Sequence, residues 1–377
     1  MYLNDSIMEN TERQLYLMRF GRESGLADLG TSESEVVNGW LAGSTVSELM
    51  ETYLERVVGE HVYSCFGRQF PLMMRLFKVQ ERMPLMVCPD DVTAFQRYDT
   101  LGKAKLWYVA DAEPGSRLYM GFRRNVSAQE LYDRVLSGTL EEVLNEVTPH
   151  RGEAYLIPPG LVHSATAGVE IAEVGESSDM DFRIYGWGRP VSSATASFTA
   201  DPAGISGTAP SDDAEELSLE ASFDFINMNE YDETLAITLP SAPLRTTSGR
   251  IPEDGLTDRL TSRREFTVNR IRLQEALHIY TERFGCFLAY LCVEGEASFQ
   301  QPRKEGGVDE FILRKGEALL VPEEVSDFFI MPRDRSTILL EAFIEPRVEE
   351  DDYIDPDAEP RLRGEEDDED TTPVWEE

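Results

Sequence analysis

Cysteine, histidine and long apolar runs are all scarce in this 377-residue chain. Its four cysteines, Cys65, Cys88, Cys286 and Cys292, lack the spacing of a metal knuckle. We therefore expect free thiols in a reducing, cytoplasmic protein. No apolar run reaches the roughly 18–20 residues of a membrane span. The N-terminus is polar and lacks the basic-then-apolar order of a signal peptide, so neither a membrane nor a secretory route is expected.

Positive charge is also in short supply, with 35 basic against 71 acidic residues and a net charge of −36. Proteins that bind nucleic acid rely on an excess of lysine and arginine, so a nucleic-acid partner is excluded. A local basic pocket for one small phosphate remains compatible with this composition. Residues 347–377 are especially rich in aspartate and glutamate and have few apolar residues, which predicts a disordered acidic tail.

An eight-residue segment occurs twice in the chain. The sequence Arg-Gly-Glu-Ala-Tyr-Leu-Ile-Pro at 151–158 is matched by Lys-Gly-Glu-Ala-Leu-Leu-Val-Pro at 315–322. The separation is about one domain's worth of chain, so the repeat predicts two related folds in tandem. The first copy is followed by His163, whereas the second copy has Asp327 at the same offset.

The pattern of apolar residues predicts a mainly β protein with two jelly-roll barrels, the first decorated by helices. We expect residues 1–190 to contain N-terminal helices, over about the first 90 residues, and the first barrel, with a helical insertion at 127–147. Residues 191–214 are rich in Ser, Thr, Ala, Gly and Pro and have no hydrophobic periodicity, which indicates a linker. Residues 215–346 then form the second barrel, and 347–377 form the tail.

His163 ends the pattern Gly-x5-Pro-x-Gly-x2-His, which begins at Gly152. A glycine turn, a short strand and a Pro-x-Gly turn would project this histidine into the mouth of a barrel. It could bind a metal ion there, or it could simply hydrogen-bond inside the barrel mouth. His61, His150 and His278 have no comparable context and are expected to be partly exposed structural residues.

The pattern at His163 resembles the second half of the cupin motif, and the wider chain resembles the short bacterial form of class I mannose-6-phosphate isomerase, a zinc-dependent double cupin. The resemblance spans about residues 39–343. It is carried by the following segments: Val87-Cys88-Pro89-Asp90-Asp91, which matches Val-His-Pro-Asp-Asp; Gly102-Lys103-Ala104-Lys105-Leu106-Trp107-Tyr108, which matches Gly-Lys-Thr-Glu-x-Trp-Tyr; and Ser178-Asp179 with Phe182-Arg183-Ile184-Tyr185.

This resemblance implies roles for particular residues. Cys88 stands at the family's first metal histidine, and Lys105 stands at its ligand glutamate. Arg183 takes the position of the catalytic arginine, while Arg75 and Arg189 fall near basic residues that bind the substrate phosphate. The implied reaction, part of carbohydrate metabolism, interconverts mannose 6-phosphate and fructose 6-phosphate through an enediol. The second barrel binds no metal in the family.

The substitutions argue against a normally filled zinc site. A catalytic zinc needs about three protein ligands, and here His163 keeps its identity while a Cys88 thiolate could replace a histidine. An ammonium at Lys105 would repel the ion, by about 4 kcal/mol per unit charge product at ~4 Å for an effective dielectric near 20. Alternatively, the ammonium replaces the metal's charge, paired with Asp90 or Asp91 and with Cys88.

Three functions follow. The chain is expected to be isomerase-like, with lost or reduced metal-dependent catalysis but a retained sugar-phosphate pocket. It could instead be an active isomerase with an altered zinc site, or a purely structural or partner-binding double cupin. Whether it is an enzyme, and whether it has a protein partner, stay open at this point.

Overall fold

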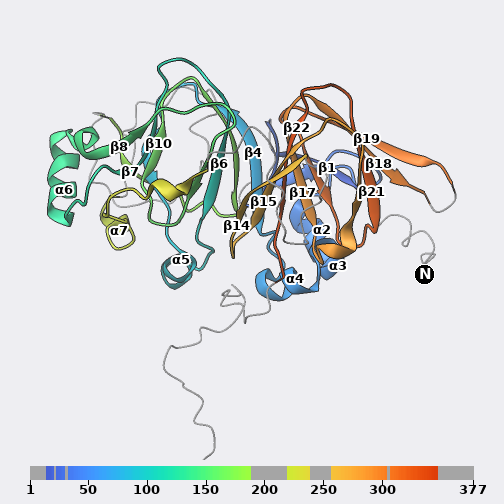
Figure 1. Cartoon of the computed structure of the whole chain (residues 1–377). Coiled ribbons are helices and arrows are strands. Elements are labelled where there is room, and N and C mark those ends of the chain that lie inside the picture. Colours follow the sequence, from blue (N-terminus) through green and yellow to red (C-terminus); the bar gives the residue numbers. More distant parts are fainter. Residues whose placement is uncertain are drawn as a thin grey trace, which may run out of the picture.

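The computed structural model describes residues 14–20, 23–29, 33–187, 219–237, 256–303 and 306–346. Arg189, the predicted linker at 191–214 and the predicted acidic tail at 347–377 lie outside these described residues. Within the described chain, strands predominate and form two barrels side by side, as Figure 1 shows. The prediction of a mainly β fold with two jelly-roll barrels is confirmed.

The first barrel has a larger and a smaller sheet. The larger sheet contains, in spatial order, β13 (Ala236–Ile237), β9 (Ala154–Ile157), β6 (Lys105–Ala112), β11 (Val169–Glu176), β4 (Leu72–Lys78) and β2 (Glu23–Leu26). The smaller sheet contains β12 (Phe182–Tyr185), β5 (Leu85–Val87), β10 (His163–Ala165), β7 (Leu118–Phe122) and β8 (Leu144–Val147). Buried apolar side chains of both sheets, including Trp107, Ile171 and Met120, fill the space between them.

The second barrel repeats this order. Its larger sheet contains β1 (Tyr16–Phe20), β20 (Ala318–Val321), β17 (Leu288–Glu294), β22 (Ile338–Phe343), β15 (Thr267–Arg272) and β14 (Thr257–Ser262). Its smaller sheet contains β16 (Leu277–Tyr280), β21 (Asp327–Pro332), β18 (Glu296–Pro302) and β19 (Val308–Arg314). The two copies of the repeated octet form the equivalent strands β9 and β20. Strand β12, by contrast, has no counterpart in the smaller sheet of the second barrel among the residues that the structure describes, which end at 346.

Two strand connections join the barrels. Strand β1 pairs with β20 of the second barrel, and β2, which follows it, pairs with β4 of the first. Likewise β13 pairs with β9 of the first barrel and β14 with β15 of the second. Because β1 and β2 also pair with each other, the larger sheets form one continuous 13-stranded sheet, with β13 and β14 at its two ends and β3 (Ser34–Val36) attached to β1.

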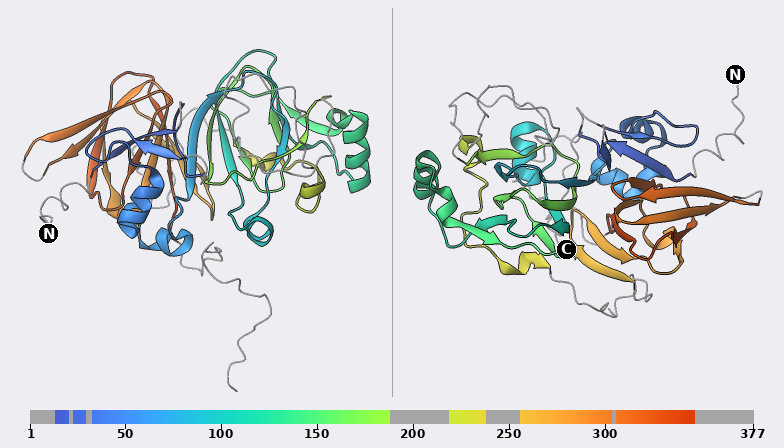
Figure 2. Two further views of the ribbon diagram at one scale, coloured as in Figure 1. Left: turned by 180° about the vertical axis from the view of Figure 1, so that it is seen from behind. Right: turned by 90° about the horizontal axis from the view of Figure 1, so that it is seen from above.

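The N-terminal segment differs in part from its predicted, mainly helical character. It contains α2 (Val46–Tyr53), α3 (Glu55–Val58) and α4 (Glu60–Phe66), but also strands β1 to β5. The helices lie beside the second barrel in both views of Figure 2. Their apolar face shares one core with that barrel, and the Phe287 N–H donates to the Val58 carbonyl. The helical pattern was predicted correctly, whereas the short strands β1 to β3 were not: they pair with one another, but β1 and β2 also depend on β20 and β4, which lie far away in the sequence.

The predicted insertion at 127–147 is helical over its first half only. Helix α6 (Ala128–Ser137) begins at Ser127, whose hydroxyl accepts the Glu130 N–H at 3.1 Å. A 3-10 turn, η1 (Leu140–Val143), follows, and residues 144–147 form strand β8 against β7. The remaining helical elements are α5 (Asp91–Tyr98), α7 (Leu219–Ser222), η2 (Glu233–Leu235) and η3 (Thr281–Arg283).

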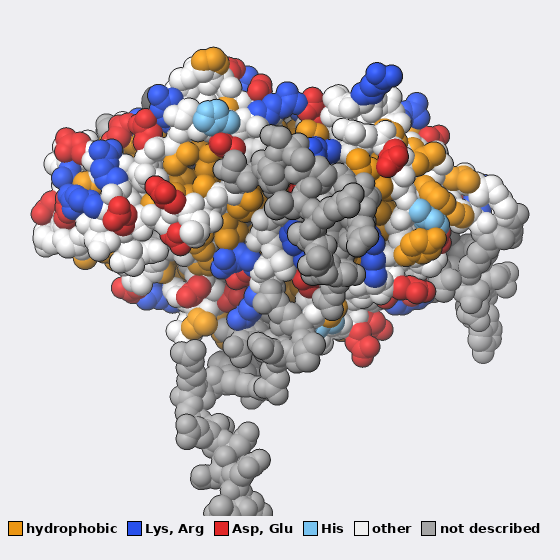
Figure 3. All heavy atoms as spheres, viewed as in Figure 1, with side chains coloured by type: hydrophobic (Ala, Val, Ile, Leu, Met, Phe, Trp, Pro, Cys, Tyr) orange, Lys and Arg blue, Asp and Glu red, His pale blue; other side chains and the backbone are white. Residues whose placement is uncertain are grey.

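The surface carries mixed charge. On the face in Figure 3, acidic and basic side chains are interspersed, with apolar patches between them. Across the contact between the barrels, Arg151 pairs with Glu294 and Lys315 pairs with Glu170, so the first residue of each octet reaches the opposite barrel. None of the described helices has the length and apolar character that a bilayer crossing would need.

Candidate functional site

One end of the first barrel brings together the residues singled out from the sequence. Cys88 follows β5, Lys105 begins β6, His163 begins β10, and Arg183 lies on β12. His163 and Arg183 both pair with Met86, in neighbouring strands. Residues directly opposite in antiparallel strands point to the same face of the sheet, so both side chains lie on the barrel-facing side.

A backbone contact fixes the turn that precedes His163. The N–H of Gly160 donates to the carbonyl of Cys88 at 2.8 Å, which ties the Pro-x-Gly turn to the end of β5. Gly160 has a φ of +84°, and a Cβ there would lie 2.5 Å from the carbonyl oxygen of Phe225. Only glycine fits this position, which explains why the Pro-x-Gly turn is part of the pattern.

The ammonium of Lys105 lies at the centre of the site and is 1% exposed. It donates to Oδ1 of Asp181 and lies 3.2 Å from Nε2 of His163. The neighbouring Lys103, also fully buried, donates to the other carboxylate oxygen of Asp181 at 2.7 Å. One aspartate therefore accepts from two buried ammonium groups.

The aspartate that pairs with Lys105 is not the one expected. We predicted Asp90 or Asp91 as partner, but each of these supports the backbone instead. Asp90 caps α5 by accepting the Thr93 N–H, and Asp91 accepts the Gly102 N–H. A cap or turn acceptor is held by local geometry next to its own helix, so these carboxylates do not reach into the barrel.

His163 is held as a neutral ring. Its Nδ1 lies 2.9 Å from the carbonyl of Leu161, which can only accept, so Nδ1 carries the hydrogen. Nε2 is then the acceptor that faces the Lys105 ammonium. Burial first, and the charge of Lys105 second, lower the pKa of His163 to about 4. The ring also packs edge-on against Trp107, with the ring centroids 5.3 Å apart.

The charged groups of the cluster stabilise one another. Burial is the largest single effect and by itself would lower the pKa of Lys105, but the acidic neighbours, Asp181 first, together outweigh it, and the net pKa is raised. Burial likewise opposes the ionised form of Asp181, yet Lys103 and Lys105 hold its pKa well below the usual range. At neutral pH the lysine is therefore an ammonium and the aspartate a carboxylate.

Cys88 is a buried thiol beside this pair. Its Sγ donates to Oδ1 of Asp181 at 3.2 Å. Burial, followed by the charge of Asp181, raises the pKa of the thiol, so it keeps its proton at neutral pH. Cys88, His163 and Asp181 each offer one ligand atom, and these atoms lie within 4.8 Å of one another. They form a candidate metal group whose Asp181 and His163 atoms also contact the Lys105 ammonium.

Arg75 occupies a different environment from the one predicted for a phosphate ligand. It is 7% exposed, and its guanidinium pairs with Glu173 at 2.8 Å. Glu173 also accepts from Nε1 of Trp107 at 2.7 Å. Burial works against the ionised form of Glu173, but Arg75 and then Lys105 lower its pKa to about 2. The guanidinium is committed to this carboxylate inside the barrel.

Three residues of the cluster were not predicted from the sequence: Lys103, Glu173 and Asp181. A usable signal existed for each. Lys103 precedes Lys105 by two residues, and Asp181 precedes Arg183 by two, which is the spacing of side chains on one face of an extended strand. Glu173 interrupts the apolar run of β11 and is 1% exposed.

A polar cavity of about 360 Å³ opens at the same end of the barrel. The loop from β11 to β12, which carries Asp181, contributes to its wall. Its lining residues are Asp28, Leu29, Ser47, Glu51, Arg68, Gln69, Thr100, Ser177, Ser178 and Asp179. Among the described residues, the Arg68 side chain makes no ion pair, so this exposed guanidinium remains available to a ligand.

The second barrel has a buried glutamate with hydrogen-bond donors like those of Glu173, but it lacks the buried lysine and arginine. Glu341 accepts from Tyr290 at 2.6 Å and from Asn269 at 2.7 Å, and it pairs in register with both. These residues match Glu173, Trp107 and Arg75 of the first barrel by strand position. Leu288 stands where the first barrel has Lys105. Among the described residues of the second barrel, no group of three potential metal ligands occurs.

The other histidines lie away from the site. His150 contacts Glu153, and His278 lies 2.8 Å from Asp327 on the outer surface of the second barrel. His61, in α4, supplies its carbonyl to the Ser64 hydroxyl.

Comparison with known proteins places these features in context. No family model matches the chain. It is 25% identical over 303 residues to the mannose-6-phosphate isomerase ManA of Bacillus subtilis, covering 78% of this chain and 81% of that protein. Identity to the mannose-6-phosphate isomerase of Streptococcus mutans is 23% over 296 residues, covering 78% and 80%. Another Bacillus subtilis relative, assigned to the same isomerases, is 31% identical over 157 residues, and the chain spans about half (48%) of its length.

Solved structures agree on the fold. The crystal structure of the mannose 6-phosphate isomerase from Bacillus subtilis superposes with a TM-score of 0.65 at 20% identity, covering 88% of this chain and 99% of that one.

Proposed function

The chain is a distant homologue of the mannose-6-phosphate isomerases, and from this relationship we propose that it binds a sugar phosphate at the open end of the first barrel. Its metal-dependent isomerase activity is lost or strongly reduced. One observation carries the proposal: the Lys105 ammonium contacts two of the three atoms that a zinc ion would need, on His163 and Asp181.

The ammonium takes over the electrostatic role of the metal. It supplies the positive charge that the Asp181 carboxylate requires, and its hydrogen bonds occupy the lone pair of His163 and one oxygen of Asp181. Zinc binds Cys as a thiolate, whereas the raised pKa of Cys88 keeps this thiol protonated. The residues as arranged therefore do not fit zinc.

The protonation states also argue against proton transfer at neutral pH. Aldose–ketose exchange needs a base with a pKa near the working pH. Glu173 has a pKa of about 2 and Asp181 lies well below its usual value, so both carboxylates are weak bases. His163 is neutral, but its Nε2 accepts from Lys105. No member of the cluster has a free lone pair with suitable basicity.

The pocket still has the groups that a sugar phosphate requires. The Asp181 side chain is 15% exposed and can accept from a sugar hydroxyl. Arg68, on the cavity wall, is the cation suited to pair with the phosphate, since Arg75 is committed to Glu173. Arg183 faces the barrel from β12, the position of the catalytic arginine implied by the resemblance. The role of Arg189 stays a prediction.

The second candidate is a zinc-dependent isomerase with a new ligand set. It is favoured by the proximity of Cys88, His163 and Asp181, whose ligand atoms lie within 4.8 Å of one another. Zinc bound there would polarise a substrate oxygen. Lys105 would then have to leave the site, and Cys88 would have to lose its proton.

Elemental analysis of the purified protein distinguishes the two candidates. We expect much less than one zinc per chain and no turnover of mannose 6-phosphate, whereas stoichiometric zinc with turnover would establish the second candidate. The double variant Lys105→Glu, Cys88→His should take up zinc, and Lys315→Glu, which changes an exposed lysine, should not. If the double variant binds no metal, the assignment of the ligand positions is wrong.

Ligand binding is tested separately by thermal denaturation. Mannose 6-phosphate should raise the melting temperature, because a ligand that binds only the folded state stabilises it by RT ln(1 + [L]/Kd). Mannose without phosphate should have a smaller effect, and Arg68→Gln should remove the difference. Equal effects of both sugars would contradict phosphate recognition and favour a purely structural role.

A further inference from the structure

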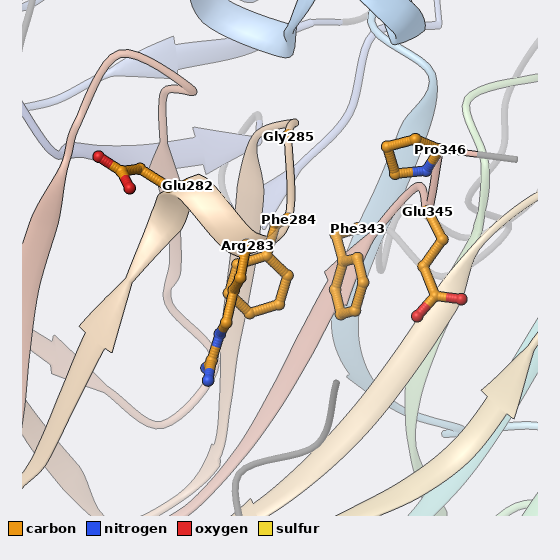
Figure 4. A pocket seen from close by; sticks show the side chains of 7 residues that line it. All are labelled: Glu282, Arg283, Phe284, Gly285, Phe343, Glu345 and Pro346. Carbon is orange, nitrogen blue, oxygen red and sulfur yellow. The ribbon is translucent and has the colours of Figure 1, made fainter. Parts of the chain in front are cut away.

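The second barrel has a small cavity of its own, at the end that corresponds to the candidate site of the first. Its volume is about 180 Å³, and Figure 4 shows its lining. The lining residues are Glu282, Arg283, Phe284, Gly285, Phe343, Glu345 and Pro346. We propose that this cavity is a second binding site, for a small monocarboxylate with a flat apolar body, independent of the sugar-phosphate site.

The position of the cavity follows from the internal repeat. Residues 282–285 connect β16 to β17, just as residues 88–104 connect β5 to β6 in the first barrel. Phe343 ends β22, the counterpart of β11, whose end leads to Asp181. The two barrels thus open at equivalent ends, although the second lacks the Lys105 and His163 chemistry.

Arg283 supplies the charge that a carboxylate would pair with. It is exposed, and among the described residues it makes neither a hydrogen bond nor an ion pair. Its guanidinium lies over the Phe284 ring, 4.7 Å from the centroid, which holds the planar group against an apolar wall. In Figure 4 the Glu282 side chain points away from the guanidinium and the rings.

The acidic groups nearby are already occupied. Glu345 pairs with Arg259 at 2.9 Å and accepts from the Ser262 hydroxyl at 3.0 Å. Glu341 lies deeper in the barrel, and its pKa is raised, first by burial. Glu282 also lines the cavity, but its side chain points away from the guanidinium, so Arg283 is a cation of the lining with no ion pair among the described residues. With two carboxylates in the same lining, a monoanion suits this cavity better than the dianion of a phosphate ester.

The apolar wall selects the body of the ligand. Phe284 and Phe343 contact edge to face, with ring centroids 4.8 Å apart and an interplanar angle of 79°. Aromatic walls favour a flat apolar group, and a carboxylate attached to it would lie beside Arg283 in a charge-assisted hydrogen bond. The cavity is smaller than the roughly 300–1,000 Å³ of pockets for drug-sized ligands, so the ligand has about one ring.

Benzoate is the probe for this site, with benzyl alcohol as its uncharged counterpart. Calorimetric titration of the full chain should detect benzoate binding that is at least tenfold tighter than binding of benzyl alcohol. Arg283→Gln should weaken benzoate binding at least tenfold. Arg335→Gln is the matched control, since Arg335 is an exposed arginine at the opposite end of the same barrel, and it should leave binding unchanged.

Several outcomes would overturn the proposal. These are no benzoate binding at millimolar concentration, equal binding of the alcohol, or equal losses in the two arginine variants. Competition between benzoate and mannose 6-phosphate would show that benzoate binds in the first barrel, and so would refute this assignment. If the unmodified chain does not bind mannose 6-phosphate, the proposed function fails but the benzoate test still stands, because the two cavities share no residue.

Discussion

Replacing Lys105 by methionine removes the ammonium at the centre of the first barrel while keeping an unbranched side chain of similar length. The ammonium is 1% exposed and bonds to Asp181 and His163. Removing one partner of a buried ion pair typically costs about 3–5 kcal/mol of unfolding free energy. Asp181 keeps its bond to Lys103, so we expect the lower end, about 3 kcal/mol, in buffer that contains a chelator.

The same variant should respond to zinc. Without the ammonium, Nε2 of His163 and Oδ1 of Asp181 lose their bonds to Lys105, and Oδ1 keeps its hydrogen bond from Sγ of Cys88, which zinc would displace. We expect zinc at one hundred times its Kd to restore about 2.7 kcal/mol, whereas the parent chain should not respond. The cost of deprotonating Cys88 makes the effect grow with pH.

Urea denaturation with chelator and with graded zinc measures both effects. Lys315→Met is the control, because Lys315 forms an exposed ion pair with Glu170 and its loss should cost less than about 1 kcal/mol. An unfolding midpoint of Lys105→Met equal to that of the parent would refute the buried ion pair. Zinc stabilisation of the parent as large as that of the variant would refute the idea that the ammonium excludes the metal.

Three further predictions concern pH, backbone strain and the contact between the barrels. The folded-state pKa of His163, about 4, lies below the usual 6.5, so the unfolded chain binds its proton first. Stability should therefore fall by about 3 kcal/mol as pH drops from 6.5 to 4, and His163→Gln should flatten this part of the pH profile of unfolding. Gly160→Ala should destabilise far more than Gly115→Ala in chemical denaturation, because both have positive φ but only the first Cβ meets a backbone oxygen, at 2.5 Å. Equal costs would show that strain in φ alone decides. Arg151→Gln should cost less than about 1 kcal/mol, since its pair with Glu294 is exposed, and 0.5 M salt should abolish the difference from the parent.

The sequence pattern predicted correctly those helices whose capping hydrogen bonds and apolar stripe lie within the helix itself. Helices α2 and α6 carry their own caps and apolar stripes, at Thr45 and Ser127, and both were predicted. The strands β1 and β2 were missed: they pair with each other, but both are short, and each also pairs with a strand far away in the sequence, β1 with β20 and β2 with β4. Strand β8 was taken as helix for the same reason: only its pairing with β7 distinguishes it.

The residues of the candidate site likewise fall into those that the sequence predicted and those that it did not. Cys88, Lys105, His163 and Arg183 were found because each stands in a short motif with fixed spacing. The partner of Lys105 could not be found in this way, since Asp90 and Asp91 are nearer in sequence but are held by the local backbone. Asp181 reaches Lys105 only because β12 is added to the smaller sheet beside β5.

The amino-acid sequence alone determined the two jelly-roll barrels, since the repeated octet and the strand pattern are local and need no partner to be read. Through the resemblance it also predicted that Lys105 stands at the position of a ligand glutamate. Tertiary structure decided what that lysine does, because charge, burial and hydrogen bonding depend on neighbours 58 and 76 residues away. It also decided that Arg75 serves a buried carboxylate, because burying a guanidinium requires a partner that only the folded sheet supplies.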